Sequence, residues 1–174
     1  MIELKCLDEM INLHLGQGME IYYRDNRLRP SMDEYYRISA LKTGGLFKLS
    51  AKLLCECANL TDEKGFSSIL DLTEKLGQHY QLKNDYSNIF KSNGDDLREG
   101  KFTAPTIFAE LDRVKYENFE ERETIIKYLI EIEADKFCLN EMARLSDEIL
   151  RLVDEIDTEL GKKNDRIRKF IESL

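Results

Sequence analysis

The chain has 174 residues, of which 42% are hydrophobic and 34% are charged, and its formal net charge at pH 7 is −8. This length can form one domain with a substantial core and does not require two. The acidic balance argues against a protein that binds nucleic-acid backbones. The first residues include acidic side chains, unlike a signal or transit peptide, and no run of about 18 apolar residues occurs. We therefore expect a cytoplasmic protein without a transmembrane segment.

Hydrophobic periodicity and the presence of only two prolines predict a chain that is helical almost throughout. The first helix is expected over about residues 2–23. The capping box at residues 31–34 (SMDE) predicts the start of a second helix, which runs to about Ala58. The segment 61–63 (TDE) predicts the start of a third, long helix, which ends before the turn-forming residues 91–96.

The second half of the chain is expected to be helical with short breaks. Ala104-Pro105 fits a helix start with proline in the first turn. Further helices are expected over residues 119–131, 134–160 and 165–174, where apolar residues recur with the helical period. The four cysteines have no C-x-x-C spacing, so we expect small, buried apolar residues and not zinc ligands. The sequence thus predicts an all-α helical bundle.

Two pairs of glycines stand inside the first two predicted helices. Gly16 and Gly18 interrupt the first helix, and Gly44 and Gly45 interrupt the second. A glycine inside a helix costs about 1 kcal/mol relative to alanine. We therefore expect these glycines to mark places where a neighbouring helix or a ligand comes close.

The C-terminal part of the third helix carries an unusual set of polar side chains. Gln81, Asn84, Asp85 and Asn88 are three, four and seven residues apart, so they share one helical face, and Lys101 follows in the next loop. Oxygen donors beside an ammonium group suit a hydrated Mg²⁺ ion that bridges to phosphate. The same pattern also suits a solvated polar face without a ligand.

Four blocks of sequence, in this order, resemble the trans-prenyl diphosphate synthases and most closely the eukaryotic geranylgeranyl diphosphate synthases. They are residues 13–25 (LHLGQGMEIYYRD), 42–47 (KTGGLF), 80–88 (YQLKNDYSN) and 96–106 (DLREGKFTAPT). The resemblance extends over essentially the whole chain, although the region after Asp112 matches in helical character only. It implies that residues 1–174 form a single, partial domain, the C-terminal portion of the isoprenoid synthase fold.

The resemblance also implies an activity and a set of site residues. Proteins of this family condense an allylic diphosphate with isopentenyl diphosphate, and Mg²⁺ ions and lysines bind the allylic diphosphate. By position, Lys42 and Lys101 would bind that diphosphate. Thr43 and Gln81 would lie near the developing allylic cation and the metal shell, and Gln17 would line the same cavity. Asn84, Asp85 and Asn88 occupy the place of the family's second aspartate-rich motif and would hold Mg²⁺.

The sequence departs from the family pattern in several places. Asn84 stands where the second motif has its first aspartate, so we expect weaker metal binding. Glu20 replaces the aspartate that is usual in its block, and the loop between Asn88 and Asp96 is shorter than in geranylgeranyl diphosphate synthases. No D-D-x-x-D occurs in the sequence. In the family, this first motif and the residues that bind isopentenyl diphosphate lie upstream of the matched region, and the helices that carry them would cover apolar faces here.

Three interpretations follow from these matches and departures. The chain is the C-terminal part of a geranylgeranyl diphosphate synthase that works only with the remaining half. Alternatively, it is a non-catalytic regulatory subunit that associates with a full-length prenyl diphosphate synthase, or a decayed homologue that only folds. A homo-oligomer or hetero-oligomer with a prenyl synthase chain is expected. We expect His14 to be a core or dimer-interface residue and His79 to serve packing, and neither to act in catalysis.

Overall fold

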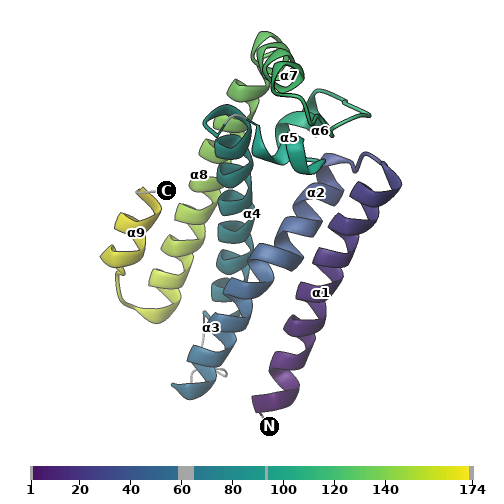
Figure 1. The fold of residues 1–174 in the computed structure, drawn as a ribbon. Coiled ribbons are helices and arrows are strands. Elements are labelled where there is room, and N and C mark those ends of the chain that lie inside the picture. The colour runs from purple at the N-terminus through teal and green to yellow at the C-terminus, as the bar shows by residue number, and fades with distance from the viewer. Residues whose placement is uncertain (1, 59–64, 93, 173–174) are drawn as a thin grey trace.

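The computed structural model describes residues 2–58, 65–92 and 94–172, with side chains from residue 7 onward. These residues form helices joined by short turns and contain no strand, which confirms the predicted all-α fold (Figure 1). The first half comprises α1 (Ile2–Asn26), α2 (Met32–Ser39), the π-helical turn η1 (Ala40–Gly44), α3 (Gly45–Cys57) and α4 (Phe66–Phe90). The second half comprises α5 (Asp95–Glu99), α6 (Ala104–Phe108), α7 (Phe119–Glu131), α8 (Ala134–Leu160) and α9 (Asp165–Glu172).

Helix α4 is the centre of the arrangement. It packs along α8 on one side, and against η1 and α3 on the other, while α1 packs on η1 and α3 (Figure 1). The short helices α5 and α6 lie beside the C-terminal half of α4, and α9 folds back on α8. This layering brings segments from both halves of the chain to the C-terminal half of α4.

The predicted second helix forms without a break in helical backbone, but its hydrogen-bonding pattern changes from α to π and back to α. Its capping box is present, because the Ser31 hydroxyl accepts from the Glu34 amide at 3.2 Å and the Glu34 carboxylate accepts from the Ser31 amide at 2.7 Å. After Ser39 the backbone forms a π-helical turn and then resumes as α3. π-Turns are rare and are frequent at functional sites, and this one contains Lys42 and Thr43.

Close helix approach explains three of the four predicted glycines. A Cβ at Gly16 would lie 2.9 Å from the Lys42 backbone nitrogen, one at Gly44 would lie 3.3 Å from the Glu74 Cα, and one at Gly45 would touch Leu13 at 3.4 Å. No described residue lies within 4 Å of a Cβ placed at Gly18, so a neighbouring helix does not account for that glycine.

Most predicted helix bounds agree with the structure, and one segment differs. The helices predicted over 119–131 and 134–160 have those bounds, and α1 extends three residues beyond the predicted end. The predicted start of the third helix at residues 61–63 and the end of the last at 173–174 lie outside the described residues. The turn predicted over 91–96 is wrong at its end, because Gly94 adopts φ 73° and α5 begins at Asp95. The left-handed glycine reverses the chain and lets a short helix start.

Three apolar clusters form the core. The cluster nearest the C-terminal half of α4 contains Tyr35, Leu82, Ala104, Ile107, Cys138 and Leu145. Cys55 and Cys138 are buried as predicted, whereas Cys57 is exposed, so the expectation of burial is wrong there because Cys57 lies on the outer face at the end of α3. The Cys6 side chain lies outside the described part. No described helix is both long enough and apolar enough to cross a membrane.

Helix α1 carries apolar side chains on a face that no described residue covers. Leu7, Ile11, Leu15 and Tyr22 are spaced by about one or two helical turns and are 47–56% exposed. The sequence-based expectation of an exposed apolar face is met on this helix.

Candidate functional site

A cavity of about 250 Å³ lies where α1, α2, η1, α4, α5 and the segment before α6 meet. Its lining includes five of the residues that the sequence singled out: Lys42, Gln81, Asn84, Asp85 and Lys101. It also includes Glu20, Tyr23, Pro30, Tyr35, Ile38, Ser39, Asp96, Phe102 and Thr103. The fold therefore brings two lysines from different segments to the oxygen-rich face of α4.

The three other predicted site residues have different positions. Thr43 lies next to the cavity, and its hydroxyl donates to Gln81. The Asn88 amide donates to the Asp96 carboxylate at 3.1 Å, one helical turn away from the lining residues of α4. Gln17 is exposed on α1 and is not among the described residues that line the cavity, so its place in the site stays a prediction.

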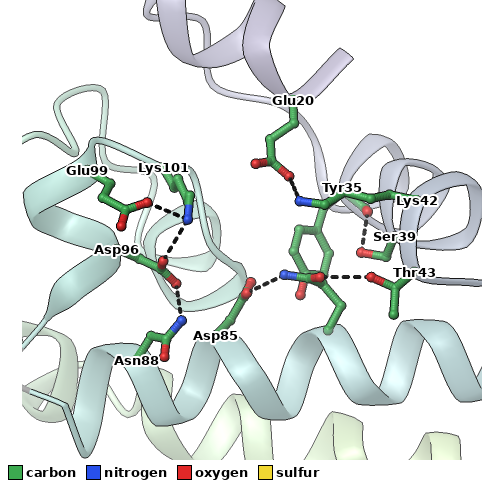
Figure 2. Close-up of polar contacts among 11 residues, drawn as sticks. Glu20, Tyr35, Ser39, Lys42, Thr43, Asp85, Asn88, Asp96, Glu99 and Lys101 are labelled. Atoms are coloured by element: carbon green, nitrogen blue, oxygen red, sulfur yellow. Dashed lines mark hydrogen bonds and ion pairs between the residues drawn. The ribbon is translucent and has the colours of Figure 1, made fainter. Parts of the chain in front are cut away.

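A chain of hydrogen bonds fixes the amide of Gln81 (Figure 2). The Thr43 hydroxyl donates to Gln81 Oε1 at 3.0 Å, and Gln81 Nε2 donates to Asp85 Oδ1 at 2.7 Å. The backbone amide of Ala104 donates to the other Asp85 oxygen at 3.2 Å. Since Gln81 and Asp85 are four residues apart on α4, they meet naturally on one helical face. These hydrogen bonds orient both the Gln81 amide and the Asp85 carboxyl group.

Asp85 is 2% exposed and forms the acidic floor of the cavity. Burial is the main cause that raises its pKa to about 7, and the charge of Asp96 adds to it. Hydrogen bonds from Gln81 and the Ala104 amide act in the opposite direction without cancelling the effect. Burial and the neighbouring Asp85 also raise the pKa of Tyr35 well above its ordinary value. The carboxyl group of Asp85 therefore takes up its proton close to neutral pH, at a much higher pH than an ordinary aspartate.

Both lysines in the cavity have carboxylate partners (Figure 2). Lys42 Nζ lies 2.5 Å from Glu20 Oε2, and Lys101 Nζ lies 2.5 Å from Glu99 and 3.4 Å from Asp96. Burial disfavours the charged form of Lys101, but Glu99 and Asp96 outweigh it and raise the Lys101 pKa. The ammonium group of Lys101 is thus held charged at the cavity.

Three of the nine lining residues that the sequence does not single out lie beside the predicted site residues: Asp96, Glu20 and Tyr35. Asp96 belongs to the block that was matched, and its position five residues before Lys101 is the signal that could have identified it. Glu20 was noted only as a substitution, and its contact with Lys42 depends on the crossing of α1 and η1. Tyr35 is a buried residue of an amphipathic helix, and no spacing signal distinguishes it from other core residues.

The donor set can be compared with the needs of Mg²⁺. No group of three or more His, Cys, Asp or Glu side chains that could hold a metal ion occurs within the described ranges. Asn84 and Asp85 present one amide and one carboxyl group to the cavity, while the Asn88 amide is engaged by Asp96. Mg²⁺ commonly keeps several waters and uses one or two carboxylates plus substrate phosphates. These residues therefore fit a hydrated Mg²⁺ whose shell is completed by phosphate oxygens.

The chain is similar to proteins of one family. The family model described as polyprenyl synthetase matches residues 4–142. A geranylgeranyl pyrophosphate synthase of Emericella nidulans is 42% identical over 109 residues, which cover 59% of this chain and 26% of the relative. A second geranylgeranyl pyrophosphate synthase, of Macrophomina phaseolina, is 30% identical over 168 residues, which cover 86% of this chain and 50% of the relative.

A protein called terpene synthase, of Matsumurasca onukii, is 41% identical over 111 residues, or 60% of this chain and 35% of the relative. The chain thus spans between a quarter and a half of the length of these curated relatives. The family match covers the segments that build the cavity, from Glu20 to Thr103. The all-α fold, the cavity with its two lysines and the family match together establish that this chain belongs to the polyprenyl synthetase family.

Proposed function

We propose that this chain supplies the diphosphate-binding side of a prenyltransferase site of the geranylgeranyl diphosphate synthase type, in isoprenoid biosynthesis. The supporting observation is that Lys42 and Lys101, from separate segments, line one cavity together with Gln81, Asn84 and Asp85. In this proposal the cavity binds the diphosphate of an allylic prenyl substrate, which then condenses with isopentenyl diphosphate. The names of the fungal relatives supply the product, geranylgeranyl pyrophosphate, and the resemblance to the family supplies the substrate class.

The proposed roles follow from the chemistry of the side chains. Each lysine carries three N–H donors and a positive charge, so Lys42 and Lys101 would stabilise the leaving diphosphate as its negative charge develops. Mg²⁺ held by Asn84 and Asp85 would supply further neutralisation of that charge. Asn88 would act from one turn away through Asp96. The oriented pair Thr43 and Gln81 would present polar groups near the developing allylic cation.

A second function is favoured by a specific observation. Asn84 is uncharged, and burial raises the pKa of Asp85 to about 7, so this face of α4 carries less negative charge than two ordinary aspartates would to attract a divalent cation. A non-catalytic regulatory subunit, or a decayed homologue, that associates with a full-length prenyl diphosphate synthase would not need strong metal binding. In either case we place the chain in the cytoplasm, as a homo-oligomer or hetero-oligomer with a prenyl synthase chain.

Reconstitution tests the enzymatic proposal. The chain is combined with a polypeptide that supplies the part of a fungal relative that the match does not cover, and is then given farnesyl and isopentenyl diphosphates with Mg²⁺. A prenyl diphosphate product that depends on Lys42, measured against the Lys42→Met variant, is the expected result. The absence of product above background, with both polypeptides folded, would refute it.

Affinity purification tests the second function. Retention of a full-length prenyl synthase by this chain at micromolar concentration, without product formed by the reconstituted pair, would favour a regulatory subunit. Failure to associate would leave no support for that function.

A further inference from the structure

The wall of the cavity contains an ion pair that the roles proposed so far do not use. Glu20 projects from α1 toward the amino group of Lys42 in η1, as Figure 2 shows, and the two charged atoms lie 2.5 Å apart. Both residues line the cavity, and their side chains are 20% and 31% exposed. The ammonium group that is proposed to bind diphosphate therefore already has a carboxylate partner within the chain.

We infer that Glu20 determines the specificity of Lys42: it acts as an internal counter-ion that disfavours metal-free anions and so selects diphosphate complexed with a divalent cation. The inference rests on the proposed function, because it requires Lys42 to bind diphosphate. It assigns to Glu20 a positioning and selecting role and no contact with the reacting atoms.

The charges of the lining support this role. Three acidic side chains (Glu20, Asp85 and Asp96) and two lysines (Lys42 and Lys101) line the cavity among the described residues. A metal-free diphosphate that approaches Lys42 also approaches the Glu20 carboxylate, and like charges at short range repel. A cation bound to the diphosphate removes most of this repulsion. Lys42 has three N–H donors, so it can keep Glu20 and still donate to a phosphate oxygen.

The second lysine provides an internal comparison. Lys101 lies 2.5 Å from Glu99, but the Glu99 side chain is 50% exposed and is not among the described residues of the cavity lining. Water screens such an exposed carboxylate, so its effect on a bound anion is small. Glu20 is less exposed than Glu99 and faces the cavity, so its removal should change anion binding more than the removal of Glu99. Asp96 also lines the cavity, but its carboxylate lies 3.4 Å from Lys101, whereas Glu20 lies 2.5 Å from Lys42.

Calorimetric titration of this chain with inorganic pyrophosphate tests the inference, once with EDTA and once with Mg²⁺. With EDTA present the pyrophosphate is free of metal, and Glu20→Gln is then expected to bind it about fivefold more tightly than the unmodified chain does. In Mg²⁺, the two proteins should differ less than twofold. Glu20→Ala serves the same test if the glutamine variant does not fold, because alanine is favourable within a helix. Circular dichroism establishes which variants are folded.

A matched control is available in another interhelical pair. Lys48 on α3 lies 3.4 Å from Glu74 on α4, and neither is among the described residues of the cavity lining. Glu74→Gln makes the same acid-to-amide change and should leave pyrophosphate affinity unchanged in both solutions. If Glu74→Gln gained as much metal-free pyrophosphate affinity as Glu20→Gln, the change in net charge alone would explain the effect, and the inference would be overturned.

The outcomes separate the inference from the function on which it rests. If the unmodified chain binds pyrophosphate in Mg²⁺ and Lys42→Met weakens that binding, the proposed function gains support. An unchanged metal-free affinity in folded Glu20→Gln and Glu20→Ala would then overturn the inference alone. If the unmodified chain binds no pyrophosphate in Mg²⁺, the proposed function fails and the inference fails with it.

Discussion

Gly77 on α4 crosses Gly44 in η1 so closely that a Cβ added to Gly77 would lie 2.3 Å from the Gly44 Cα. Backbone meets backbone at this point, so a flexible side chain cannot move aside. The contact sets the distance between η1, which holds Lys42 and Thr43, and α4, which holds Gln81 and Asp85. The crossing of two glycines is thus the structural basis of the Thr43–Gln81 hydrogen bond.

The glycine crossing predicts a strong effect of one methyl group. Gly77→Ala should lower the free energy of unfolding by about 2–4 kcal/mol, because the helices must separate to admit the methyl. Urea denaturation followed by circular dichroism measures the change. Gly18→Ala is the matched control, since nothing lies within 4 Å of its Cβ position, and it should be neutral or stabilising by up to about 1 kcal/mol. Equal stability of Gly77→Ala and the unmodified chain would contradict the crossing.

The hydrogen bond between Thr43 and Gln81 should contribute measurably to stability. Removal of the hydroxyl in Thr43→Val, or of the amide in Gln81→Leu, is expected to cost about 1 kcal/mol or more, because a partner is left unsatisfied. The double variant should cost less than the sum of the two single variants, since the same bond is removed only once. A double-mutant cycle from urea denaturation measures this coupling, and strict additivity would argue that the two side chains do not interact.

Buried His79 predicts a loss of stability in acid. Burial, with a smaller contribution from the charge of Lys83, lowers the His79 pKa in the folded chain below its ordinary value of 6.5. The unfolded chain then binds more protons, so stability from this group is fully present above about pH 6.5 and falls as the pH drops toward the folded pKa. Thermal unfolding from pH 7.5 to 5 should show a smaller decline in His79→Gln. His14→Gln makes the same change at the exposed histidine of α1 and serves as the matched control.

The raised pKa of Asp85 predicts a pH dependence of stability opposite in sign to that of His79. Its folded pKa of about 7 lies above the ordinary value of 3.8, so the folded chain binds the proton more tightly. The stabilising contribution is present at low pH and is lost as the pH rises from about 4 through 7. Comparison of Asp85→Asn with the parent, both in the His79→Gln background, removes the competing slope of the histidine. A parent and a variant with the same pH dependence would contradict a raised Asp85 pKa.

The two cavity lysines predict a loss of ligand binding without a loss of stability. Lys42→Met and Lys101→Met should each weaken the binding of pyrophosphate in Mg²⁺ by about tenfold, because a charge-assisted hydrogen bond is removed. Their free energies of unfolding should change little, since both side chains are partly exposed. Lys48→Met removes an interhelical lysine outside the cavity and should bind as the unmodified chain does. Calorimetry measures the affinities, and equal affinities in all four proteins would refute the placement of the anion site.

Local signals allowed much of the secondary structure to be predicted. The bounds of α7 and α8 and the capping box at Ser31 depend on residues that are close in sequence, and these predictions are confirmed. The π-turn and α5 were missed because neither has a side-chain pattern of its own. The π-turn is imposed where η1 packs between α1 and α4, and α5 depends on the left-handed Gly94.

In the candidate site, too, some features follow from local sequence and others from the packing of the helices. The sequence by itself determined that Gln81, Asn84 and Asp85 share a face, because the helical period fixes the directions of residues three and four apart. It also determined family membership through the four ordered blocks. Only the tertiary structure decided that Lys42 and Lys101 line one cavity and that Glu20 pairs with Lys42. Those relationships depend on how closely the helices cross, and that distance is set by packing at Gly16, Gly44 and Gly77.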